Sequence, residues 1–223
     1  IKSVHPNGPY RLGGYCTGGQ IAYAIGCSLR KQGDDVELVA IIDGNAPGIT
    51  LTHPSVWSSK RISCILKSLP FWLVDYKDLG LAGVWQRLRK KLRFNRFTKR
   101  KLIGAENYVV EDVILDNPTQ LPDYQMNLLV TELNAISKYK PENYDGQVVV
   151  ITSRYPTISQ AINGPLDPFL GWDRLVRGKI KRYEVRSTHR NIHLPPYCFE
   201  LADYLQDELK RADGKNWAVD KVC

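Results

Sequence analysis

The sequence predicts an α/β fold in which a parallel sheet is interrupted by a long, mainly helical insertion. Two groups of strand and helix patterns, at residues 10–43 and 147–211, support the sheet. The segment between them contains no strand with the apolar pattern of a buried sheet, which supports the insertion. The 223 residues suit one large domain or one domain with an insertion.

The first group of elements begins with a short strand that ends near Tyr15. A helix follows over residues 20–29, where apolar residues recur at steps of three and four, and Gly33 marks its end. Residues 36–43 are short, rich in branched side chains and almost continuously apolar, which is typical of a strand buried on both faces. Strand, helix and strand therefore form one βαβ unit.

The later elements fall into an insertion and a second part of the sheet. Helical patterns in the insertion cover residues 58–69, 80–92 and 123–138. The sheet resumes with strands over residues 147–152 and 180–185, followed by a helix over residues 194–211. We therefore expect core segments at 1–45 and 140–212, an insertion at 46–139 and a tail at 213–223.

The composition limits the classes of function. The five cysteines are an odd number and include no CxxC pair, so we expect a reducing compartment, no disulfide framework and no zinc or other metal site. No apolar run approaches the roughly 20 residues of a membrane span, and no signal peptide is visible, so a cytoplasmic protein is expected. The net charge of +8 favours an acidic partner, which could be nucleic acid, anionic lipid or protein.

The segment Gly14-Tyr-Cys-Thr-Gly18 has the form G-x-C-x-G, the pattern of a nucleophile elbow with sulfur in place of oxygen. We expect Gly14 and Gly18 to give room to a strained turn, and Gly19 to let the helix pack closely on the sheet. The helix N-terminus would stabilise a Cys16 thiolate, and the backbone N–H of Thr17 would be one donor of the oxyanion hole. The alternative is a small buried cysteine on a glycine-rich turn.

A nucleophile of this kind needs an acid and a base. Asp43 lies at the carboxyl end of the next predicted strand, on the same edge of a parallel sheet as the elbow, although it could simply cap a loop. Of the four histidines, His5 precedes the elbow and His53 lies at the start of the insertion. His189 and His193 lie between the last strand and the last helix, where the base belongs, and the alternative for either is a histidine in a surface loop.

These residues resemble the type I thioesterase domains, of the α/β-hydrolase fold, that end nonribosomal peptide synthetases and related polyketide synthases. The elbow of that family typically reads G-G-[YWH]-S-x-G-G, and residues 13–43 are similar to it, with Cys in place of Ser. The resemblance implies that Asp43, 27 residues after Cys16, is the catalytic acid. It also implies that His189, 12 residues before Leu201, is the base rather than His193.

The family resemblance also implies a partner and a mechanism. The insertion at 46–139 would be a lid, no cofactor would be bound, and the substrate would be presented on the phosphopantetheine of an acyl or peptidyl carrier domain. A Cys–His–Asp triad would release the chain by hydrolysis or by intramolecular cyclisation. In the family, further strands and a loop with the second oxyanion donor precede the elbow, so we expect that N-terminal part to be missing here or to lie on another chain.

Two features depart from this interpretation or extend it. Residues 186–188, Arg-Ser-Thr, replace the P-G-x that usually precedes the catalytic histidine of the family. Residues 87–101 form a basic run without an acidic residue. This run suits a solvated face of the lid or a docking site for an acidic carrier domain. Basic amphipathic helices also bind nucleic acid and membrane surfaces, which we do not expect here.

Two other functions remain open from the sequence. A dienelactone-hydrolase-like enzyme would use the same Cys16 and His189 on a small lactone, with Asp167 in place of Asp43 as the acid. The long insertion argues against this enzyme. A noncatalytic, basic binding module would retain the fold without the chemistry.

Overall fold

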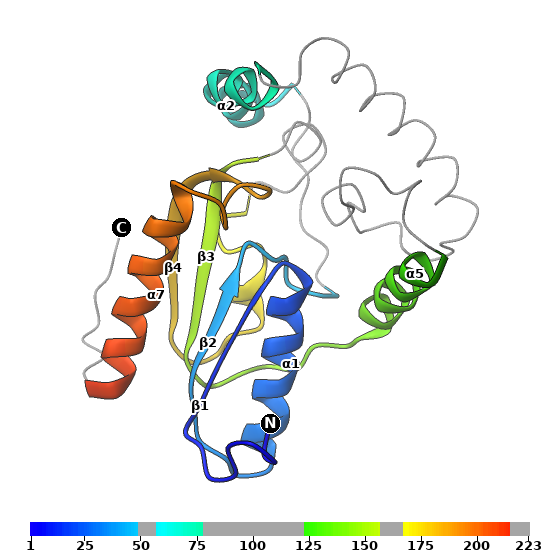
Figure 1. Cartoon of the computed structure of the whole chain (residues 1–223), viewed down its shortest axis with the longest axis vertical. Helices are drawn as coiled ribbons and strands as arrows, with labels where there is room; N and C mark the ends of the chain where they lie inside the picture. Colours follow the sequence, from blue (N-terminus) through cyan, green and yellow to red (C-terminus); the bar gives the residue numbers. More distant parts are fainter. Residues whose placement is uncertain (49–56, 78–122, 157–166, 215–223) are drawn as a thin grey trace. The chain divides into compact units, whose positions relative to one another are not determined.

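The computed structural model describes residues 1–48, 57–77, 123–156 and 167–214 (Figure 1). The chain divides into two compact units. The first consists of Ile1–Ala46, Pro141–Arg154 and Pro168–Cys223, and the second of Pro47–Lys140 and Tyr155–Asp167. All three candidate triad residues belong to the first unit.

The first unit is built on a parallel sheet. Its described strands are β1 (Tyr10–Tyr15), β2 (Val36–Ile42), β3 (Val148–Tyr155) and β4 (Ile180–Thr188), in this spatial order. Strand β2 pairs in parallel with both β1 and β3. On the other side of β3, the N–H of Val148 donates to the carbonyl of Lys179 at 2.9 Å, and the Thr152 hydroxyl donates to the carbonyl of Tyr183 at 3.3 Å, so β4 runs in the same direction. The predicted α/β fold with a parallel sheet is confirmed.

Two helices cover the sheet on opposite faces (Figure 1). Helix α1 (Thr17–Lys31) packs on β1 and β2, and helix α7 (Tyr197–Gly214) packs on β4 and β2. Successive side chains of a strand point to opposite faces, so Ile41 lies against Gly19 of α1, while Leu38 faces the α7 side. Six buried residues form the core cluster on the α7 side: Leu38, Val149, Ile151, Val185, Ile192 and Leu201. Burial of each large apolar side chain contributes about 1.5–3 kcal/mol to folding.

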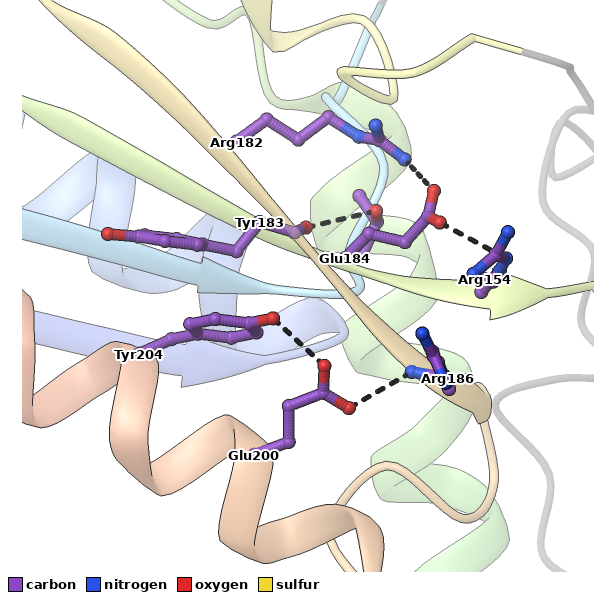
Figure 2. A network of polar contacts seen from close by, with 8 residues as sticks. Arg154, Arg182, Tyr183, Glu184, Arg186, Glu200 and Tyr204 are labelled. Atoms are coloured by element: carbon purple, nitrogen blue, oxygen red, sulfur yellow. Dashed lines mark hydrogen bonds and ion pairs between the residues drawn. The ribbon is translucent and has the colours of Figure 1, made fainter. Parts of the chain in front are cut away.

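Polar contacts fix strand β4 near its carboxyl end (Figure 2). Glu200, in the first turn of α7, accepts hydrogen bonds from the backbone N–H of Arg186 at 3.3 Å and from the Tyr204 hydroxyl at 2.9 Å. On the β3 side, Glu184 forms an ion pair with Arg154 at 3.5 Å. The strand is therefore held on both sides close to the point where it leads into the histidine loop.

The second unit contains two described helices, α2 (Ser59–Lys77) and α5 (Asp123–Lys138). No helix of the described ranges is long and apolar enough to cross a membrane. The predicted helix at 80–92 and the basic run at 87–101 lie outside the described residues. The function of segment 46–139 as a lid stays a prediction.

Several observed boundaries differ from the predicted ones. Helix α1 begins at Thr17 rather than residue 20, directly after the elbow. Strand β4 continues to Thr188, and its last two residues, Ser187 and Thr188, are polar but buried. Helix α7 begins at Tyr197 rather than residue 194, because Pro195 and Pro196 lack the N–H groups of a helix interior.

Candidate active site

Cys16 lies on a strained turn between β1 and α1. Its backbone has φ 55° and ψ −122°, outside the conformations that a residue with a side chain usually adopts. The turn is held by the Cys16 N–H, which donates to the carbonyl of Ile42 at 2.8 Å. Cys16 is the N-cap of α1 without a capping side-chain hydrogen bond, and the first helical residue is Thr17. The Gly19 N–H donates to the Cys16 carbonyl at 3.1 Å. The first N–H groups of a helix point out of its N-terminus, so the helix start can stabilise negative charge at this position.

The elbow glycines differ in their steric importance. A Cβ atom at Gly14 would lie 2.2 Å from the carbonyl carbon of Gly18, so this position cannot accept a side chain without rearrangement. A Cβ at Gly19 would lie 2.8 Å from the Cγ2 of Ile41 on β2. At Gly18, a Cβ would meet no atom of the described residues within 4 Å. Among the described residues, the steric need for glycine thus lies at Gly14 and Gly19, and the role of Gly18 in the turn stays a prediction.

Gly44 is a further residue that the sequence reasoning did not assign to the elbow. A Cβ at this position would lie 2.3 Å from the carbonyl oxygen of Cys16, so the turn after β2 packs directly on the backbone of the elbow. The carbonyl of Gly44 accepts a hydrogen bond from the Nε1 of Trp172 at 2.6 Å, and this tryptophan is fully buried. The sequence signal that could have identified this residue is a glycine directly after the acidic residue that ends the strand.

Asp43 and His189 form a buried pair at the carboxyl edge of the sheet. The Oδ2 of Asp43 lies 2.9 Å from the Nδ1 of His189, and the two side chains are 7% and 4% exposed. The other carboxylate oxygen, Oδ1, accepts a hydrogen bond from the backbone N–H of Ser153 at 2.7 Å. Because both oxygens are engaged, the carboxylate has one fixed orientation toward the imidazole.

The surroundings of His189 favour its protonated form. Burial lowers the pKa of the imidazole, but the hydrogen bond and charge of Asp43, together with the nearby Cys16 side chain, raise it to about 10. The Nε2 atom forms no hydrogen bond with Cys16 or with any other described residue. Nε2 therefore has the capacity to exchange a proton with a reacting group near the elbow.

The other histidines occupy different positions. His193 is exposed and contacts the ring of Tyr15 at a centroid distance of 5.5 Å. His5 packs edge-on against Tyr10, at the amino end of β1. His53 lies outside the described residues. The structure thus brings His189, and not His193, to Asp43.

The remaining predicted site features are located as follows. Asp167, the alternative acid, belongs to the second compact unit, whereas Asp43 is the carboxylate hydrogen-bonded to His189. Cys16, Cys27, Cys64 and Cys198 are free thiols. Within the part of the chain that the structure describes, no group of three or more His, Cys, Asp and Glu side chains is arranged to hold a metal ion.

The carboxyl ends of three parallel strands supply the candidate site. Cys16 follows β1, Asp43 follows β2 and His189 follows β4, so the sheet gathers the three residues at one edge. A strained cysteine at a helix start, with an Asp–His pair beside it, has the composition needed for nucleophilic acyl transfer. The fold and this arrangement define a domain of the α/β-hydrolase class.

Comparisons with known proteins specify the family. The model of the thioesterase domain family matches residues 1–55. The chain is 44% identical over 222 residues to the chondramide synthase cmdD of Chondromyces crocatus, covering 94% of this chain and 5% of the synthase. It is 38% identical over 199 residues to a non-reducing polyketide synthase of Pseudevernia furfuracea, covering 88% of this chain and 9% of that protein. The chain thus spans a small part of the curated relatives that it matches.

A solved structure agrees in fold. The RedJ thioesterase from the prodiginine biosynthetic pathway of Streptomyces coelicolor superposes with a TM-score of 0.51 at 15% sequence identity, over 93% of this chain and 65% of that one. Residues 1–55 thus match the thioesterase domain family, and the relatives of the chain include a dimodular nonribosomal peptide synthase and non-reducing polyketide synthases.

Proposed function

We propose that this chain releases an acyl or peptidyl chain from the phosphopantetheine thioester of a carrier protein, through a covalent intermediate on Cys16. The observation that carries the proposal is the buried Asp43–His189 pair beside the strained cysteine, in a chain whose residues 1–55 match the thioesterase domain family. Asp43, rather than Asp167, is the carboxylate that this geometry supports as the acid.

The first half of the reaction forms the acyl-enzyme. In the resting pair, His189 Nε2 carries the proton of the Cys16 thiol, and the Cys16 thiolate attacks the carbonyl carbon of the thioester. The Thr17 N–H donates to the oxyanion of the tetrahedral intermediate. The bond between the carbonyl carbon and the phosphopantetheine sulfur then breaks, and that sulfur leaves with the proton from His189. The carrier thiol is released and the acyl chain is bonded to Cys16 sulfur.

The second half of the reaction frees the product. Water, or an amine or hydroxyl group of the same acyl chain, attacks the Cys16 thioester while His189 takes the proton of the attacking group. The bond between the carbonyl carbon and Cys16 sulfur breaks, and the thiolate recovers its proton from His189. Water gives a free acid, and an internal nucleophile gives a macrocycle or lactone. Because a thioester is exchanged for a thioester, the intermediate retains its reactivity toward either nucleophile.

The experiment is intact-protein mass spectrometry after exposure to acyl and peptidyl thioesters. We expect one acyl mass on the parent protein and none on Cys16→Ala, with His189→Gln acylated far more slowly. Analysis of the released product separates hydrolysis from cyclisation. An adduct that persists on Cys16→Ala, or the absence of both adduct and turnover with a series of thioesters, would exclude Cys16 as the nucleophile and favour a noncatalytic module.

A further inference from the structure

The ring of Tyr15 contacts His189 in two ways. The two rings are stacked, with centroids 4.9 Å apart and planes inclined by 25°. The Tyr15 hydroxyl also donates a hydrogen bond to the backbone carbonyl of His189 at 2.6 Å. One side chain thus holds both the imidazole and the main chain of the same residue.

The position of Tyr15 links this contact to the elbow. Tyr15 is the last residue of β1 and precedes Cys16 directly, and the Cys16 backbone is fixed by its hydrogen bond to Ile42. His189 directly follows β4, which is at the other end of the described sheet order. The side chain of Tyr15 therefore joins the turn that carries the sulfur to the loop that carries the imidazole.

The ring of Tyr15 is not part of the buried core. Its relative exposure is 36%, so burial of its surface gives it less stabilisation than a core residue receives. The hydroxyl nevertheless finds a carbonyl acceptor and the ring finds the flat face of an imidazole. A smaller or purely apolar residue would lose one or both of these contacts.

We infer that Tyr15 is a positioning residue, which holds the His189 imidazole in the orientation that presents Nε2 to the Cys16 sulfur. Three restraints then define the imidazole: Asp43 binds Nδ1, the Tyr15 ring fixes the plane, and the Tyr15 hydroxyl fixes the backbone. Without the ring, the imidazole retains one hydrogen bond, about which it can rotate. This inference rests on the proposed function, because it takes His189 as the base for Cys16.

The test compares two Tyr15 variants with a matched tyrosine. Tyr15→Phe keeps the stacked ring and removes the hydroxyl, and Tyr15→Leu removes both contacts. Tyr10→Phe is the control, because the Tyr10 hydroxyl also donates to a backbone carbonyl, that of His5 at 2.8 Å, at the other end of the same strand. All variants are made in the full chain, and circular dichroism establishes that each is folded.

The first readout is the rate of Cys16 alkylation by iodoacetamide at pH 7, followed by peptide mass spectrometry with Cys198 as the internal reference. An unassisted cysteine is only a few per cent thiolate at this pH, so we expect Tyr15→Leu to slow Cys16 by about tenfold. Loss of one hydrogen bond in Tyr15→Phe should slow it by about threefold. Tyr10→Phe should match the parent, and Cys198 should react equally in all proteins.

The second readout is the downfield proton resonance of His189 Nδ1–H, which reports its hydrogen bond to Asp43. We expect this resonance to broaden or disappear in Tyr15→Leu, to persist in Tyr15→Phe and to be unchanged in Tyr10→Phe. A general loosening of the fold would not produce this ranking.

Two results would overturn the inference. One is a folded Tyr15→Leu protein with parental Cys16 reactivity and an intact resonance. The other is an equal loss of Cys16 reactivity in Tyr10→Phe, or a parallel change at Cys198. Alkylation by iodoacetamide needs no thioester, so the two hypotheses fail separately. A parent protein that forms no acyl-enzyme would refute the proposed function. The comparison of Tyr15 variants would still show whether Tyr15 positions His189.

Discussion

At the residue scale, the site depends on two residues, at the ends of neighbouring strands, whose backbone conformations are unfavourable for residues with a side chain. Cys16 has φ 55° and Asp43 has φ 52°, and each such position costs on the order of 1–3 kcal/mol. A Cβ at Gly14 would meet Gly18 inside the elbow, and a Cβ at Gly44 would meet the Cys16 carbonyl, so the lack of both lets the two turns pack together. Strain at the proposed nucleophile and acid is thus compensated by neighbouring glycines and by hydrogen bonds to the sheet.

Side chains at the crowded glycines of the two turns should destabilise the fold. Gly14→Ala and Gly44→Ala place a Cβ 2.2–2.3 Å from backbone atoms, which must move, so we expect a loss of about 2–5 kcal/mol in the free energy of unfolding. Gly18→Ala is the matched control, since its Cβ meets nothing among the described atoms and alanine favours the helix. Thermal unfolding measures all three. Equal melting temperatures for Gly14→Ala and Gly18→Ala would contradict the steric account.

The second prediction concerns pH. The folded-state pKa of His189 is raised to about 10, whereas an unfolded histidine titrates near its ordinary value of 6.5. The stabilisation from the imidazolium is therefore complete below about pH 6.5 and is lost as the pH rises toward about 10. We expect the difference in melting temperature between the parent and His189→Gln to shrink from pH 6 to pH 10. A difference that is constant or grows over this range would show that the protonated imidazole does not stabilise the fold.

At the element scale, sequence patterns predicted the strands and helices better than the contacts between them. Continuous apolar runs identified β2 and β3, because strands buried on both faces tolerate few polar residues. The end of β4 was missed because the buried Ser187 and Thr188 break that pattern. The order of elements predicted that Asp43 lies at the edge of the elbow but left both His189 and His193 open as its partner, and the choice of His189 came from the family resemblance. The contact between Gly44 and the elbow depends on two turns that meet only in space.

The contact between α7 and β4 includes a buried carboxylate. Glu208 is fully buried, and its Oε1 is bound by Lys181 at 3.0 Å, by Arg211 at 3.4 Å and by the hydroxyl of Tyr183. Burial of the ring and the Glu208 carboxylate raise the pKa of the Tyr183 hydroxyl. The carboxylate therefore connects the last helix to the strand that leads to His189.

The third prediction tests this connection. Glu208→Gln removes the charge that balances Lys181, which is only 15% exposed, so we expect a loss of about 2–3 kcal/mol in the free energy of unfolding. Asp207→Asn, at an exposed position of the same helix, is the control and should change the stability by less than about 0.5 kcal/mol. Urea unfolding gives both values. Equal effects of the two substitutions would indicate that the Glu208 contacts add nothing beyond general charge.

At the scale of the whole molecule, the proposed function pairs a basic chain with a substrate that another domain would deliver. The net charge is +8, and the chain spans 5% of the chondramide synthase and 9% of the polyketide synthase that it resembles. In such an arrangement, we propose that recognition is divided. The elbow and its Asp–His pair act on the thioester, while basic surface residues attract an acidic carrier domain.

The last prediction follows from this division. Salt screens charges over a Debye length of about 10 Å at 0.1 M, so the KM for a carrier-linked thioester should rise with ionic strength by about tenfold, whereas kcat/KM for a small soluble thioester should stay constant. The double variant Lys90→Glu/Lys91→Glu, in the basic run, should reproduce the high KM at low salt. Arg177→Glu/Lys179→Glu makes the same change in net charge at two exposed positions of the first unit and is the control. Equal increases in KM for both double variants would assign the effect to net charge alone. A KM independent of salt would exclude electrostatic docking, because the attraction between an acidic carrier and basic residues must weaken when their charges are screened.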